Sequence, residues 1–518
     1  MLQDININPV QPSISETNLN IVTGGGPAQV GVNEFTPLFE RDQVRMNASG
    51  LLGNHDNVGG EAVVSAVYNQ FSLSAGAFHF ATDGFRANNH IEHDIVNVYG
   101  QMAVTPKFNI QAEFRRRETE FGDLELNFDP GQFDVVEAHS LDQNMGRFGI
   151  RYSPAPSSDL LVSVIYNDRE ESRGGSSLDI RADDEGYQAE AQYLYRRNRF
   201  NLTAGLAYAD VDRVFGFSAD QFNTSFTSRS QITHPRGYAY ANLTYPETVV
   251  WTVGVSYDDY DEDALEVEEV NPKFGVQWDI TRNLRFRSAL FQTVKPALVS
   301  NRTIEPTQIA GFNQLFDDVN ATRSRVYGVG LDWRATGNLL VGAEAAWREL
   351  DVPIFVNSGV VSQQQDEQVY RAYVNWTPMA ELAVSGELVY DRFEAEKGLA
   401  TASGRFPEKL ATMRIPLAAR YFHPKGYFAG IGASYVHQTV RRSDISPLAD
   451  GTDEFVAVDA ALGYRLPRRR GTVSLELRNL FDREFNFQDD GFREFADEPS
   501  TGPYIPDRVV LLRVSLNL

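Results

Sequence analysis

The last nine residues of the chain alternate between two kinds of position. One set of alternate positions is apolar throughout and holds Val510, Leu512, Val514, Leu516 and Leu518. Because successive side chains of a β-strand point to opposite faces, this run has one apolar face and one largely polar face. The same pattern recurs along almost the whole sequence. It predicts a single sheet closed on itself, with lipid outside and water inside.

The composition excludes several classes of protein. The chain has 518 residues, of which 42% are hydrophobic, and its mean hydropathy is −0.34, which is too polar for a bundle of membrane helices. A transmembrane barrel needs an apolar residue only at every second position of a strand. The sequence contains no cysteine, which excludes disulfides and thiolate metal sites. A net charge of −23 argues against nucleic acid as a partner.

The chain divides into two parts of unequal length. Proline and glycine interrupt residues 1–42, which we interpret as a periplasmic lead-in or linker. Residues 43–518 form the predicted transmembrane β-barrel. The start of the chain shows neither a basic segment nor an apolar segment of a signal peptide. We therefore expect that the signal was removed or that this is the C-terminal part of a longer chain.

Two kinds of connection, short turns and longer loops, alternate along the predicted barrel. Short turns rich in proline, glycine, asparagine and charge are expected near residues 68–70, 105–107, 154–158, 196–198, 246–248, 281–283, 335–338, 378–380, 423–426 and 467–470. Long polar loops are expected near residues 121–144, 215–233, 294–321, 354–365, 397–407, 443–453 and 486–507. Short periplasmic turns and long extracellular loops are typical of outer-membrane barrels. The pattern predicts an all-β fold, a transmembrane antiparallel up-and-down β-barrel of about 22 strands.

Aromatic residues stand at both ends of several apolar faces, as in the runs from Trp251 to Tyr257 and from Tyr327 to Trp333. Membrane–water interfaces favour such placement. A soluble β-sandwich or propeller would also alternate. A soluble fold of that kind would not need short and long connections to alternate. The sequence also shows no propeller-blade repeat of about 40–50 residues.

The C-terminal region carries a motif. Residues 479–485, with the sequence NLFDREF, resemble the NLFD-x-x-Y/F segment that ends the penultimate strand of TonB-dependent receptors. Pro506 and Arg508 precede the last strand, as in that family, and Thr303–Gln308 is similar to one of its loops. Residues 33–41 and 310–318 are similar to a subgroup in which such a barrel follows tetratricopeptide repeats. The resemblance implies a cell outer-membrane barrel that transports a ligand, but residues 1–42 are too few for that family's plug domain.

The predicted lumen is wide. A barrel of about 22 strands has a backbone diameter of roughly 40–45 Å, and barrels of this size are normally plugged. A partner, an upstream domain or inward-folded loops should therefore fill it. The polar alternate positions of the strands are expected to face the lumen. They give these lumen-lining candidates: Glu113, Arg115, Glu190, Arg285, Arg287, Glu387, Asp459, Glu476, Arg478 and Arg513.

No catalytic, cofactor-binding or metal-binding arrangement emerges from residue spacing, and we expect no enzyme. The predicted function is transport of a ligand across the outer membrane, with the plug absent or supplied elsewhere. The alternatives are an export pore or an outer-membrane anchor at the C-terminus of a larger periplasmic repeat protein. Expected partners are outer-membrane lipid and lipopolysaccharide, and an upstream periplasmic domain or a plug-like partner is a further candidate.

Overall fold

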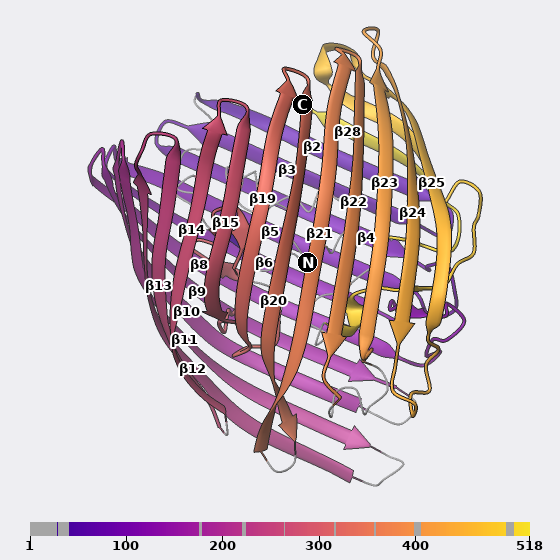
Figure 1. Cartoon of the computed structure of the whole chain (residues 1–518), viewed down its shortest axis with the longest axis horizontal. Helices are drawn as coiled ribbons and strands as arrows, with labels where there is room; N and C mark the ends of the chain where they lie inside the picture. The colour runs from indigo at the N-terminus through magenta and orange to yellow at the C-terminus, as the bar shows by residue number, and fades with distance from the viewer. Residues whose placement is uncertain are drawn as a thin grey trace.

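The computed structural model describes residues 28–29, 41–175, 179–219, 224–263, 265–314, 318–356, 359–397, 406–493 and 502–518. A closed barrel of 22 strands dominates it (Figure 1). The barrel strands are β2 (Gln43–Gly53), β3 (Val58–Tyr68), β4 (Phe71–Thr82), β5 (Ile91–Thr105), β6 (Phe108–Phe121), β8 (Ala138–Ala155), β9 (Ser158–Gly174), β10 (Asp179–Arg197), β11 (Phe200–Ala219), β12 (Thr224–Thr244), β13 (Val249–Glu262), β14 (Leu265–Thr281), β15 (Leu284–Val294), β19 (Arg323–Thr336), β20 (Leu339–Val356), β21 (Gly359–Met379), β22 (Leu382–Ala395), β23 (Lys409–Phe422), β24 (Tyr427–Arg441), β25 (Gly451–Arg465), β26 (Gly471–Arg478) and β28 (Val509–Asn517). The predicted fold class and strand number are confirmed.

Each barrel strand pairs antiparallel with its neighbour along the chain, and the first and last strands close the ring. Leu52 of β2 lies opposite Leu512 of β28 in this seam. Closure gives each barrel strand a paired neighbour on both sides, which a sheet surrounded by lipid requires because lipid offers no hydrogen-bond partner. The chain ends at the rim with the short turns, the upper rim in Figure 1. We assign this rim to the periplasm.

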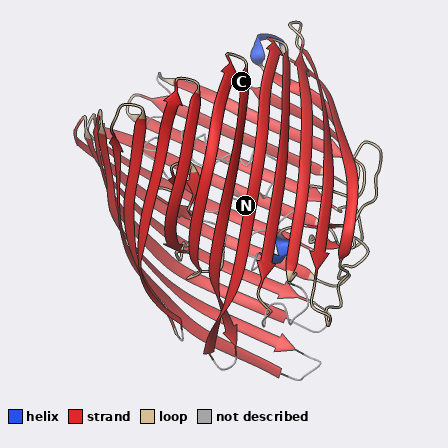
Figure 2. Ribbon diagram, viewed as in Figure 1, coloured by secondary structure: helices blue, strands red, loops and turns tan. Residues whose placement is uncertain are grey.

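Short elements lie outside the barrel strands, before β2 or in the connections (Figure 2). They are β1 (Ala28–Gln29), β7 (Asn127–Phe128), β16 (Arg302–Thr303), β17 (Gln308–Ile309), β18 (Phe312–Asn313), β27 (Phe487–Gln488) and the 3₁₀ helices η3 (Pro467–Arg469) and η4 (Gly491–Arg493). Among the described residues, no helix is long and apolar enough to cross a membrane.

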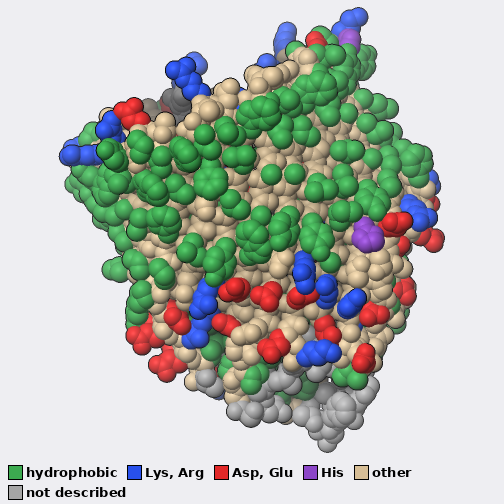
Figure 3. Space-filling view, viewed as in Figure 1, with side chains coloured by type: hydrophobic (Ala, Val, Ile, Leu, Met, Phe, Trp, Pro, Cys, Tyr) green, Lys and Arg blue, Asp and Glu red, His purple; other side chains and the backbone are tan. Residues whose placement is uncertain are grey.

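The outer wall of the barrel is apolar. Side chains that a soluble protein would bury are exposed there, among them Leu206 (70%), Leu462 (61%) and Val253 (55%). On the face of the molecule drawn in Figure 3, hydrophobic side chains form a broad band, with acidic and basic side chains gathered beyond its lower edge. An apolar belt bounded by charge matches the hydrocarbon core and headgroup layer of a bilayer.

The ten short turns lie where the sequence predicts them, but two predicted loops are wrong. Residues 215–233 belong mainly to β11 and β12, and most of residues 354–365 belong to β20 and β21. Ser225 opposite Ser218 and Gln363 opposite Val352 show that the ladders continue there in register. Main-chain pairing needs no apolar face outside the bilayer, so these strands extend beyond the membrane although their side chains are polar.

Candidate functional site

One extracellular connection enters the barrel. Residues 295–314, called here the lumen loop, follow β15 and carry Ile304, Ile309 and Phe312 with at most 1% of each side chain exposed. Ile309 and Phe312 pack in one apolar cluster with wall residues that include Tyr238 of β12 and Phe291 of β15. A connection between two strands acquires such burial only by folding into the lumen.

Two glycines of the wall make room for this loop. A Cβ at Gly328 of β19 would lie 2.4 Å from Cδ1 of Phe312, and a Cβ at Gly275 of β14 would lie 2.9 Å from Cγ2 of Ile309. Both distances are shorter than real Cβ contacts, so any larger residue would displace the loop. The inner wall is therefore shaped to receive the lumen loop.

Buried ion pairs hold the lumen loop to strands far apart around the wall. Arg302 Nη1 lies 2.8 Å from Glu113 Oε2 of β6, and Glu305 Oε2 lies 3.0 Å from Arg236 Nη1 of β12. Glu190 of β10 accepts the backbone N–H of Ile304 at 2.6 Å. All four charged side chains of the two pairs are at most 7% exposed. Buried charges persist only when they are paired in this way.

The lumen loop also meets the N-terminal part of the chain. β1 pairs parallel with β16, with Ala28 opposite Arg302 and Gln29 opposite Thr303. The backbone of the expected lead-in thus reaches the loop at these two residues. The division at residue 42 into lead-in and barrel stays a prediction.

Two other loops also pack against the inner wall. They are residues 122–137 and the described part of residues 479–508, and they are called here the second filling. β7 of the 122–137 loop pairs with β27 of the 479–508 loop. Leu126 and Phe487 are buried with Phe455 of β25 in one apolar cluster. Arg86 donates to the Glu125 carbonyl at 2.6 Å and to Asp123 Oδ1 at 3.1 Å. The β7–β27 pairing joins the two loops to each other, and the apolar cluster packs them on β25. Arg86 ties the 122–137 loop to the connection between β4 and β5.

Burial shifts the pKa values of Asp489 and Arg442, two charged residues at these loops. Desolvation raises the pKa of the Asp489 carboxyl to about 8, while the backbone N–H groups of Leu126 and Gly491 oppose the shift. The neighbouring charge of Glu125 raises this pKa further. Burial lowers the pKa of Arg442 to about 10, although Asp450 and Glu125 act in the other direction. Asp489 is therefore largely protonated at neutral pH.

The predicted lumen residues share one face of their strands, the face opposite the exposed apolar side chains. Glu113 is 5% exposed, for example, whereas the next residue, Phe114, is 50% exposed. The structure brings Glu113 and Glu190 together with the lumen loop, as described above. Arg287 lies 5.2 Å over the ring of Phe312, a third contact with that loop.

The other predicted residues contact the wall itself or the second filling. Arg285 pairs with Asp279 at 2.7 Å, Glu387 with Arg371 at 2.6 Å, and Glu476 with Arg513 at 3.1 Å. Asp459 accepts the N–H of Asn479 at 2.9 Å. Arg115 and Arg478 are half-buried on the same faces as Glu113 and Glu476. That the ten residues line a ligand path stays a prediction.

Sequence reasoning missed Arg302, Glu305 and Arg236. The first two lie in a loop without alternation, where only the resemblance at Thr303–Gln308 marked the region. Arg236 shares its strand face with Tyr238 and Tyr240, so extending the alternation of β12 would have found it. The pairing of Arg236 with Glu305, 69 residues away, has no signal in the sequence.

The NLFD motif has a local structural role. Asn479, with a φ of 45°, begins a turn directly after β26. Its side-chain Nδ2 donates to the Arg483 carbonyl at 2.9 Å and to the Ile505 carbonyl at 3.1 Å. Asp482 accepts the backbone N–H of Arg508 at 2.9 Å. The motif therefore fastens both ends of the loop that precedes the last strand.

Solved structures of known proteins share this fold. The copper transporter OprC is 11% identical, with a TM-score of 0.68, and the match covers 93% of this chain and 81% of that one. The FrpB iron transporter from Neisseria meningitidis is 12% identical, with a TM-score of 0.70 and coverage of 93% and 82%. The siderophore receptor PiuA from Acinetobacter baumannii is 11% identical, with a TM-score of 0.67 and coverage of 92% and 82%.

No curated protein matches the sequence. The family model described as "TonB dependent receptor-like, beta-barrel" matches residues 65–480, which is most of the chain. The NLFD turn, the closed ring of 22 strands and the apolar belt agree with this match. The chain belongs to the TonB-dependent-receptor-like β-barrel family of the cell outer membrane.

Proposed function

We propose that this barrel transports a ligand across the outer membrane and that its in-folded loops act as the gate. The observation that carries the proposal is the lumen loop, anchored inside the barrel by the buried pairs Arg302–Glu113 and Glu305–Arg236. A ring of about 22 strands would leak small solutes if it were empty. A loop held by paired charges keeps such a ring closed until something displaces it.

The proposed cargo is a metal ion or its chelate. Three proteins with this fold carry the names copper transporter, iron transporter and siderophore receptor. The fold likeness supports this class of cargo. The ten predicted lumen residues are proposed to line the path.

The proposed partners lie on the periplasmic and lipid sides. Several ion pairs on the inner wall keep substantial exposure, with Arg371 and Glu387 each 34% exposed and Arg285 and Asp279 at 49% and 45%. A polar surface of this kind fits a plug-like partner or an upstream periplasmic domain. The family's energy-coupling protein TonB would act from the same side. Outer-membrane lipid and lipopolysaccharide would contact the apolar belt and the charged rim beyond it.

Single-channel conductance in planar bilayers tests the gate. We expect low conductance from the parent protein. Replacement of residues 298–313 by a short Gly-Ser linker should raise it strongly, because this change removes the lumen loop and leaves the strands. Replacement of the rim turn Pro467–Arg469 by Gly-Gly-Ser is the control and should leave conductance low.

Two outcomes would contradict the proposal. A parent protein with high constitutive conductance would favour the export pore. A loop replacement that leaves conductance unchanged would show that the lumen loop does not close the barrel. Heat-modifiable mobility on gels reports that each variant remains a folded barrel.

A further inference from the structure

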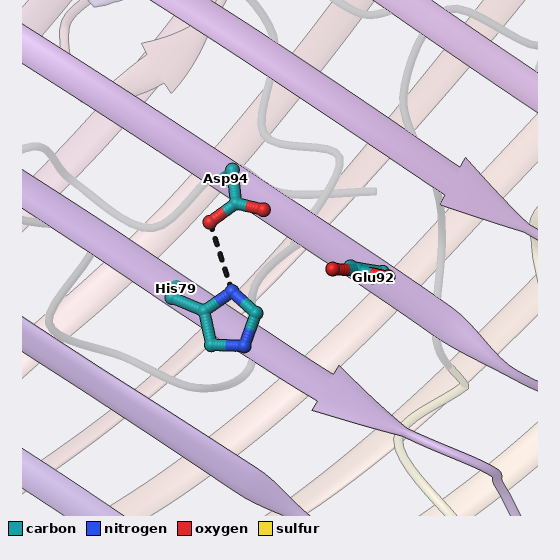
Figure 4. A group of neighbouring side chains, drawn as sticks. All are labelled: His79, Glu92 and Asp94. Carbon is teal, nitrogen blue, oxygen red and sulfur yellow. Dashed lines mark hydrogen bonds and ion pairs between the residues drawn. The ribbon is translucent and has the colours of Figure 1, made fainter.

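Three ligating side chains converge on the outer wall, away from the lumen. His79 of β4 lies directly opposite Asp94 of β5, and Glu92 precedes Asp94 by two residues, so all three share one face. Nδ1 of His79 is 2.8 Å from Oδ1 of Asp94. One ligand atom from each residue lies within 4.8 Å of the other two (Figure 4).

The cluster stands where the apolar belt ends. Leu73 on β4 and Val96 on β5 share its face toward the periplasm and are 55% and 50% exposed. The side chains of His79 and Asp94 are 44% and 43% exposed, which leaves an ion accessible from the extracellular side. The flanking residues Phe78 and Phe80 are buried on the other face of β4, which keeps His79 directed outward.

The neighbouring strand adds further acidic side chains to the same face. On the next pair of strands, Asp94 lies opposite Glu118, and Glu92 lies opposite Glu120. Like charges directly opposite on one face of a sheet are destabilising. Arg116 pairs with Glu118, and His79 pairs with Asp94. Arg116 neutralises only one of these four carboxylates, and an imidazole that binds a metal is itself neutral, so a bound divalent ion would offset part of the remaining negative charge.

The ligand types indicate which ion. Ca²⁺ and Mg²⁺ select oxygen ligands, whereas an imidazole with carboxylates suits Zn²⁺ and related divalent transition ions. Ligands of one Zn²⁺ ion, at about 2.0–2.2 Å from it, lie roughly 3–4 Å apart, so small side-chain rotations would complete the set. We propose that His79, Glu92 and Asp94 form a divalent transition-metal site that bridges β4 and β5, with water in the remaining positions. This site faces away from the lumen, so it does not rest on the proposed function.

Calorimetric titration with Zn²⁺ tests the proposal on the full, untagged chain in detergent, after treatment with chelator. The parent protein should bind one equivalent of Zn²⁺ that His79→Ala lacks. Glu92→Gln should weaken binding of this equivalent by about tenfold or more, because it removes one charged ligand and keeps the shape. Heat-modifiable mobility should be the same in all variants.

His437→Ala is the matched control. His437 and Glu454 also form a pair on the outer wall, 3.8 Å apart, but within the described chain no third ligating side chain converges on them. This variant should bind Zn²⁺ as the parent does. Equal isotherms for the parent and His79→Ala would overturn the proposal, as would Glu92→Gln binding with parental affinity. Equal losses in His79→Ala and His437→Ala would also overturn it, since they would indicate nonspecific binding to surface histidines.

Discussion

At the scale of single residues, the buried charges of the lumen matter most. Arg236 lies between two carboxylates, 3.0 Å from Glu305 and 3.4 Å from Glu190, and all three side chains are at most 4% exposed. Such an arrangement is stable only while it is complete, because desolvation penalises any charge left without its partner. The guanidinium of Arg236 thus links the lumen loop to β12 and β10.

Replacement of this arginine should loosen the loop. Arg236→Met leaves Glu190 and Glu305 without the guanidinium, at a cost of about 3–5 kcal/mol. Hydrogen exchange should become faster at Ile304, whose N–H donates to Glu190. Arg285→Met is the control, since its pair with Asp279 is about half exposed and should contribute less than about 1 kcal/mol. Unchanged exchange at Ile304 in Arg236→Met would refute this role.

The protonated Asp489 predicts a dependence on pH. Its folded-state pKa of about 8 lies above the ordinary Asp value of 3.8. The unfolded state therefore releases the proton first, and the packing of this loop loses stability as pH rises from about 4 to about 8. Amide protection over residues 485–493, corrected for intrinsic exchange, should fall across this window. Protection that rises with pH, or stays level, would contradict the assignment.

At the scale of elements, each wall strand has a face toward the lipid. How well that face tolerates a charged residue depends on the depth of the residue in the bilayer. On β13, Trp251, Val253, Val255 and Tyr257 form that face, and Asp261 continues it beyond Tyr257. An aromatic residue at each end therefore marks the width of the apolar belt on this strand. The strand continues past the second aromatic residue and still pairs with β12 at Asp258, Asp261 and Glu262.

An arginine should be costly only within that belt. Val253→Arg places a charge in the hydrocarbon region and should destabilise the barrel by about 2–4 kcal/mol, whereas Asp261→Arg should cost about 0–1 kcal/mol. Denaturant unfolding followed by circular dichroism measures the difference. Equal losses at the two positions would place the membrane boundary elsewhere on β13.

At the scale of the whole molecule, closure and filling are separate properties. The β2–β28 seam closes the ring by main-chain pairing, whereas the lumen loop and the 122–137/479–508 loops fill it by side-chain packing. The two fillings enter from different parts of the wall. Their two apolar clusters share no residue, so either filling can be replaced without removing core residues of the other.

Removal of both fillings should open the barrel more than either removal alone. Replacement of residues 298–313 and of residues 486–505 by short linkers, singly and together, separates their contributions. The conductance gained by the double variant should exceed the sum of the single gains, because each filling limits the passage that the other leaves. A double variant that conducts no better than the loop 298–313 variant would show that the second filling does not close the lumen.

The sequence by itself determined the fold class, the number of strands, the short turns and the family. These follow from local signals, since a period of two, a turn motif and the NLFD segment are each read within a few residues. The same local signals predicted loops at residues 215–233 and 354–365, where the structure has mainly strands. Strands that pair outside the bilayer need no apolar face, so the sequence shows no sustained alternation there.

Only the tertiary structure decided what occupies the lumen and what gathers on the outer wall. Arg302 reaches Glu113 across 189 positions of the chain, and the His79 cluster depends on the register between β4 and β5. Ring closure and loop burial create these contacts, and neither leaves a period or a motif in the sequence. The alternation at the C-terminus therefore predicted a wide barrel, while the packing of its loops decided that the barrel is filled.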